Sequence, residues 1–223
     1  MKRRGPLLTL AAAAVLGMAL LITNISKQEE PNKPAPAAQS QPAVAESAGP
    51  APTAGDAPAA AAPFPAKQDY VDNEIATATG VITLSITIEG DKAIAYACDG
   101  NTIETWLKGS AVGGELSLAN ADNTSRLDGR LDGPDLAGTL FIGDKSWPYV
   151  AAPVAPPAGI YVNTVDGSRQ SWIVAADGTV TGVQRGPGGV TSPAPALSPN
   201  GTAVVDGETV TAVQVSGGDV DVF

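Results

Sequence analysis

Apolar and polar side chains alternate one by one over residues 82–89, and this pattern constrains the fold more than any other feature of the chain. The apolar positions are Ile82, Leu84, Ile86 and Ile88. Because successive side chains of a strand point to opposite faces, such an alternation predicts a strand with one buried face. Gly90-Asp91 follows as a predicted hairpin turn, and the return strand is expected over residues 92–98.

Short strands separated by turn residues are predicted along most of the remaining chain. They cover residues 102–108, 115–118, 125–131, 137–142, 145–150, 159–165, 170–175, 179–184 and 208–215. Regular short strands of this kind predict an all-β fold, an antiparallel meander closed as a barrel or folded as a sandwich. A proline-rich break at residues 153–157 divides the domain into two possible lobes, residues 69–152 and 158–223.

An uncharged and mainly apolar segment covers residues 5–25 and follows Lys2, Arg3 and Arg4. About 20 apolar residues suffice to cross a bilayer as a helix, and basic residues before the helix favour a cytoplasmic N-terminus. A cleaved signal peptide is the alternative, but no pair of small residues at the spacing for cleavage follows the apolar core. We therefore expect residues 1–26 to form a cytoplasmic stub and an uncleaved transmembrane anchor, which contacts the lipid bilayer through residues 5–25.

Proline and alanine dominate residues 27–68, and almost no large apolar side chain occurs there before Phe64. Proline fixes φ and lacks a backbone N–H, and a segment without large apolar side chains has nothing to bury. The composition predicts a disordered tether that reaches on the order of 100 Å when fully extended. Residues 69–223 then form an extracytoplasmic β-domain.

The chain contains no histidine and one cysteine, Cys98. The missing histidine excludes Ser-His-Asp and Cys-His catalysis, and the two counts together exclude the common zinc sites. With 13 basic and 23 acidic side chains the formal net charge is −10, which argues against nucleic-acid binding because such proteins present a basic surface to phosphates. We expect no nucleic-acid partner, no cofactor, and no catalytic or metal-binding residue.

Three side chains are singled out as candidates for a buried thiol or a ligand contact. Cys98 shares a predicted strand face with Ile94 and Tyr96, and because free cysteine is among the most buried residue types we expect a buried, inert thiol. Trp106 and Tyr149 are the candidate ligand contacts. Exposed aromatic rings can stack on sugars or bases, but core packing is the more common use in a chain with 4% aromatic residues.

Four short segments carry a resemblance to a known family. They are residues 93–100 (AIAYACDG), 105–109 (TWLKG), 143–147 (GDKSW) and 158–161 (AGIY). These segments resemble an uncharacterised domain of exported, membrane-anchored proteins from high-GC actinobacteria, and the likeness spans about residues 85–165. The resemblance implies an extracytoplasmic β fold and implies no catalytic residue.

The sequence therefore predicts a single-pass protein of the cell envelope whose acidic β-domain is a binding or accessory module for a protein, glycan or lipid. A sensor or regulatory ectodomain that works with a membrane partner is one alternative. A hydrolase of cell-wall glycans is another, because such enzymes use two carboxylates. The candidate carboxylates are Glu89, Glu104, Glu115 and Glu208. The aspartates within residues 128–135 match no calcium-binding repeat, and we expect them in turns.

Overall fold

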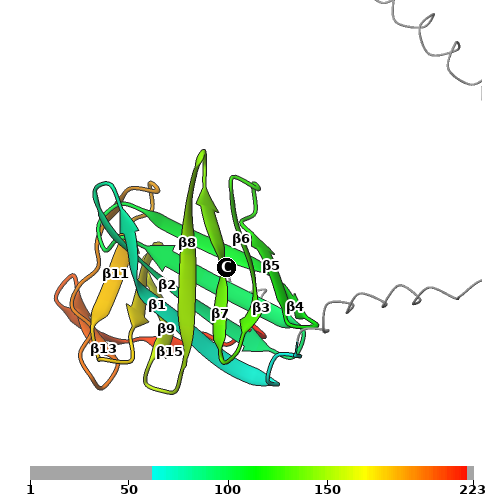
Figure 1. Ribbon diagram of the computed structural model, residues 1–223. Helices are drawn as coiled ribbons and strands as arrows, with labels where there is room; N and C mark the ends of the chain where they lie inside the picture. Colours follow the sequence, from blue (N-terminus) through cyan, green and yellow to red (C-terminus); the bar gives the residue numbers. More distant parts are fainter. Residues whose placement is uncertain (1–61, 220–223) are drawn as a thin grey trace, which may run out of the picture. The chain divides into compact units, whose positions relative to one another are not determined.

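The computed structural model describes residues 62–219, which form strands and turns and contain no helix. The first eight strands are β1 (Lys67–Thr77), β2 (Gly80–Glu89), β3 (Lys92–Cys98), β4 (Glu104–Val112), β5 (Glu115–Ala119), β6 (Ser125–Asp132), β7 (Asp135–Ile142) and β8 (Lys145–Val154). Each pairs antiparallel with the next, and β8 pairs with β1 to close a barrel (Figure 1). The predicted all-β antiparallel meander is confirmed, and it closes as a barrel.

Side chains fill the barrel interior. The predicted apolar face of β2 points inward, and the isoleucines and leucine of that face have no exposed surface. Small residues of β3 lie directly opposite these large ones, as in the cross-strand pairs Ile86↔Ala95 and Ile88↔Ala93. Alternating large and small side chains suits a barrel of eight strands, whose interior is just wide enough to be filled by side chains. Burial of each isoleucine stabilises the fold by about 1.5–3 kcal/mol.

A second sheet packs against one side of the barrel and is drawn in yellow and orange in Figure 1. Its strands follow the order β12-β11-β10-β9-β15. Their bounds are β9 (Gly159–Val165), β10 (Ser168–Val174), β11 (Val180–Arg185), β12 (Thr191–Pro193) and β15 (Val213–Gln214). The outward side chains of β3, Ile94, Tyr96 and Cys98, are buried under this sheet against Ile160 and Ile173. The strand β3 is therefore apolar on both faces because it lies between two cores.

A short hairpin adds a third layer at the second sheet. It consists of β13 (Thr202–Val205) and β14 (Glu208–Thr211), and the small cluster of Trp172, Leu197, Ala203 and Ala212 includes residues of this hairpin and of β10. The single strand predicted over residues 208–215 is wrong, because the chain changes partner at Ala212. The amide of Ala212 donates to the carbonyl of Gly201, so β14 pairs with β13 whereas β15 pairs with β9.

The strand β1 was not predicted from the sequence. Its pairing register with β2 shifts between Asp72 and Ile75, which breaks the alternation that reveals a strand. The predicted anchor over residues 5–25 lies outside the described residues, as does most of the predicted tether. Within residues 62–219 no helix is long and apolar enough to cross a membrane.

Candidate functional site: a groove at the junction of barrel and second sheet

A groove of about 460 Å³ lies where β4 of the barrel meets β10 and β11 of the second sheet. Its lining includes three basic residues, two acidic residues and one tryptophan. These are Lys108, Arg169, Arg185, Glu104, Asp122 and Trp106. Three of the chain's 13 basic side chains thus meet in one groove of an acidic protein.

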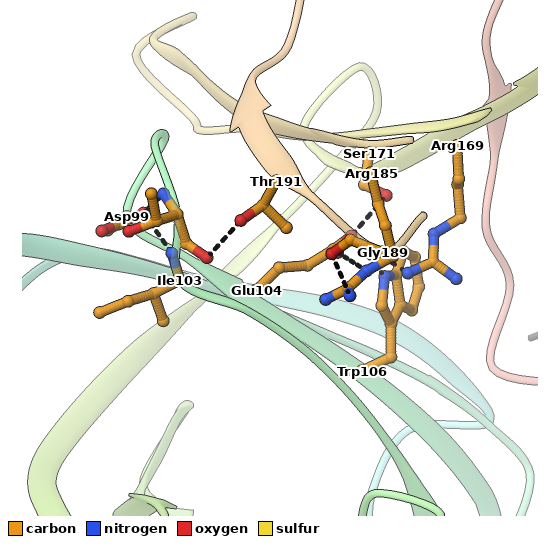
Figure 2. A network of polar contacts seen from close by, with 10 residues as sticks. Asp99, Ile103, Glu104, Trp106, Arg169, Ser171, Arg185, Gly189 and Thr191 are labelled. Atoms are coloured by element: carbon orange, nitrogen blue, oxygen red, sulfur yellow. Dashed lines mark hydrogen bonds and ion pairs between the residues drawn. The ribbon is translucent and has the colours of Figure 1, made fainter. Parts of the chain in front are cut away.

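Glu104 lies at the contact between barrel and second sheet, and its side chain has no exposed surface. Arg169 Nη2 donates to Glu104 Oε1 at 3.1 Å, and Arg185 Nε donates to Glu104 Oε2 at 2.6 Å. The hydroxyl of Ser171 and the indole N–H of Trp106 both donate to Oε1, each at 3.3 Å. Figure 2 shows both guanidinium groups reaching Glu104 from the second sheet. The buried carboxylate is therefore fully paired and joins the two sheets.

The turn before β4 is held by hydrogen bonds that fix the approach to Glu104. Asp99 Oδ1 accepts the backbone amides of Asn101, Thr102 and Ile103 at 2.8–2.9 Å. The carbonyl of Thr102 in turn accepts the hydroxyl of Thr191 on β12 at 3.0 Å (Figure 2). In tight turns an aspartate side chain commonly accepts hydrogen bonds from the backbone amides of the residues that follow it. This turn and the second sheet are thus connected directly.

Trp106 lines the groove and is half-buried. Its ring lies 4.5 Å from that of Tyr96 between centroids, with an angle of 32° between the planes. The guanidinium carbon of Arg169 lies 5.3 Å from the centroid of the indole, within the range of a cation–π interaction. Leu107 of the same strand points into the barrel, whereas Trp106 is on the other face of β4. There it lines the groove and packs against the core between the barrel and the second sheet.

Tyr149 lies inside the barrel and is 3% exposed. Its hydroxyl donates to the carbonyl of Asp128 at 3.4 Å, and burial raises the pKa of the phenol. A Cβ atom at Gly129 would collide with this hydroxyl, so the glycine makes room for the ring. The structure does not bring Tyr149 and Trp106 together, and only Trp106 lines the groove.

Cys98 is a free thiol with no exposed surface, at the end of β3. Its expected burial is confirmed. Burial raises the pKa of the Cys98 thiol to about 11. Because the thiolate is the reactive form, this environment makes the group unreactive at neutral pH.

The other candidate carboxylates lie on separate elements. Glu89, at the end of β2, has its pKa lowered by a hydrogen bond from the hydroxyl of Ser216 and by Lys67, whose Nζ lies 3.7 Å away. Glu115 begins β5 and lines a different hollow, on the barrel surface, together with Asp128. Glu208 is exposed on β14. None of these three carboxylates lines the groove with Glu104.

Sequence reasoning missed the partners of Glu104. Arg169 and Arg185 follow it by 65 and 81 residues, and no spacing rule connects such positions. The one available signal was the alternation of Glu104, Trp106 and Lys108, which places these three side chains on the same face of β4. No cluster of three or more Cys, Asp or Glu side chains within residues 62–219 is arranged to hold a metal ion.

Comparison of the chain with protein-family models, with curated proteins and with solved structures finds no match. The likeness to exported actinobacterial proteins therefore stays a prediction.

Proposed function

We propose that the chain is a membrane-anchored protein of the cell envelope whose extracytoplasmic β-domain is a binding module, with the groove beside Glu104 as its ligand site. The observation that carries the proposal is the meeting of Lys108, Arg169 and Arg185 in one groove of a chain with net charge −10. Concave surfaces with a few convergent polar groups are the usual form of ligand sites. A fully paired Glu104 supplies a rigid base for such a site.

The anchor part of the proposal rests on residues 2–25, where three basic residues precede an uncharged apolar segment. Its test is the N-terminal peptide of the mature protein isolated from membranes. Mass spectrometry should find residues 1–25 still attached. A mature chain that begins after this segment would make the protein a secreted one.

The groove part is tested by capture of cell-envelope components on immobilised full-length protein in a neutral detergent. Lys108→Glu reverses one charge in the groove, and Lys145→Glu makes the same change at the exposed start of β8. We expect at least one envelope component to be retained by the wild type and by Lys145→Glu, and to be lost with Lys108→Glu. Equal retention by both variants would contradict the proposal.

The geometry of the groove supports a glycosidase or a sensor ectodomain less well than a binding module. A glycosidase needs two carboxylates that flank the scissile bond. In the groove, both oxygens of Glu104 accept from guanidinium groups, and Asp122 accepts the amide and hydroxyl of Thr124 in its own loop. A sensor or regulatory ectodomain would use the same groove, with the captured component being a membrane protein. The identity of that component therefore separates a sensor from a glycan or lipid binder.

A further inference from the structure

We propose that the groove beside Glu104 binds an oxyanion, a carboxylate or phosphate group carried by an organic ligand, through the guanidinium groups of Arg169 and Arg185. The inference rests on the proposed function and adds the chemical class of the ligand.

Both guanidinium groups keep N–H donors that no acceptor within residues 62–219 uses. A guanidinium has five N–H bonds. Arg169 gives one nitrogen, Nη2, to Glu104, and its Nε is buried without a hydrogen-bond partner. Arg185 gives Nε to Glu104 and Nη1 to the carbonyl of Gly189 at 3.2 Å, which leaves Nη2. The side chains of Arg169 and Arg185 are 26% and 39% exposed, and both residues line the groove.

Glu104 holds the two guanidinium groups in place and cannot itself contact a ligand, since its side chain has no exposed surface. Arranging two guanidinium groups around one carboxylate leaves a surplus positive charge beside it. Lys108 adds a second positive charge to the lining, and Asp122 opposes it with one negative charge. Asp122 is fixed toward Thr124 in its loop. The lining as a whole is thus cationic, in contrast to the chain.

The coverage of Trp106 favours an oxyanion over a neutral sugar. A sugar that stacks on an aromatic ring needs a free face. One side of the indole packs on Tyr96, and the guanidinium of Arg169 lies within 5.3 Å of the ring. Trp106 therefore positions Arg169, and the guanidinium groups are the recognition elements. Guanidinium forks match carboxylate and phosphate oxygens in geometry and charge.

The size of the groove favours an organic ligand over a bare ion. Its volume of about 460 Å³ corresponds to roughly fifteen water molecules at about 30 Å³ each. A carboxylate or phosphate at the guanidinium groups would leave room toward Asn120 and Ala121 for the remainder of the molecule.

The three indole N–H groups of the protein provide the test. Full-length protein in a neutral detergent is titrated with glucuronate, with glycerol 3-phosphate, and with glucose and glycerol as neutral counterparts, while ¹⁵N–¹H spectra are recorded. The Trp106 signal should shift and saturate with at least one anion and with neither neutral compound. Trp172, whose indole donates to the carbonyl of Pro195, and Trp147, which packs on the barrel core, should stay in place. The anion that saturates the Trp106 shift at the lower concentration shows whether the groove prefers a carboxylate or a phosphate.

Two variants that keep Glu104 complete the test. Lys108→Gln should weaken the apparent affinity roughly twofold to fivefold, as for loss of one partly exposed charge contact. Lys145→Gln should leave it unchanged. If neutral compounds shift Trp106 as much as the anions do, or if no anion shifts it, the oxyanion proposal is wrong. If the capture of an envelope component still depended on Lys108 in that case, the proposed function would stand without the oxyanion proposal. If neither the Lys108-dependent capture nor the anion-dependent shift of Trp106 were found, both proposals would be wrong.

Discussion

Arg185 Nε lies 2.6 Å from Glu104 Oε2, and this contact joins the second sheet to the barrel across 81 residues of sequence. The side chain of Glu104 has no exposed surface, and Arg185 and Arg169 are its ion-pair partners. Removing one partner of a buried ion pair leaves an uncompensated charge. This lowers the free energy of unfolding more than replacing the whole pair by apolar side chains does.

Glu104→Ala is therefore expected to lower the free energy of unfolding by about 2–3 kcal/mol. The effect should fall below that of a fully buried pair because both arginines keep contact with solvent. Chemical denaturation followed by tryptophan fluorescence measures it. Glu208→Ala, at an exposed position of β14, is the matched control and should change stability by less than about 0.5 kcal/mol. Equal effects at the two positions would contradict the central role of Glu104.

Gly129→Ala should destabilise the barrel by about 1–3 kcal/mol, the usual cost of overpacking a core. A Cβ atom at this position would collide with the hydroxyl of Tyr149. Because Tyr149→Phe removes that hydroxyl, the double variant should recover part of the loss. Gly188→Ala is the control, since no atom lies within 4 Å of its Cβ position. If Tyr149→Phe made no difference, the collision would not be the cause.

Cys98 is expected to resist thiol reagents in the native protein at pH 7. Its side chain has no exposed surface, and its pKa of about 11 keeps the thiol protonated. Labelling measured by mass spectrometry should be complete within minutes in denaturant and nearly absent over the same period without it. Rapid labelling of the native protein would show that the junction core opens readily.

Stability should fall as the pH rises above the ordinary pKa of a thiol. The folded protein holds the Cys98 proton up to a pKa of about 11, whereas the unfolded chain releases it near 9.0. Between these values the unfolded state binds fewer protons, so the free energy of unfolding decreases with pH and levels off near pH 11. The change over the whole window is about 2–3 kcal/mol. Comparison of wild type with Cys98→Ala between pH 8 and 11 isolates this contribution, and parallel curves would contradict it.

The sequence predicted the antiparallel β-meander better than it predicted the groove, because the two depend on different kinds of information. The inward face of β2 is a local pattern, readable from Ile82 to Ile88 alone. The apolar face of β3 with Ile94, Tyr96 and Cys98 is likewise a local pattern, but nothing local revealed the second sheet that covers it. The junction requires Glu104 to meet two arginines far along the chain, and such pairings follow only from the three-dimensional arrangement of the sheets.

The most direct test of the groove as a ligand site is photo-crosslinking in living cells. A photoreactive amino acid replaces Ala121, which lines the groove, or Val204, which is 59% exposed on β13. After illumination, mass spectrometry of the full-length protein should find a defined adduct from position 121 and none from position 204. Adducts from position 204 alone, or the same adducts from both positions, would contradict the assignment of the groove as the binding site.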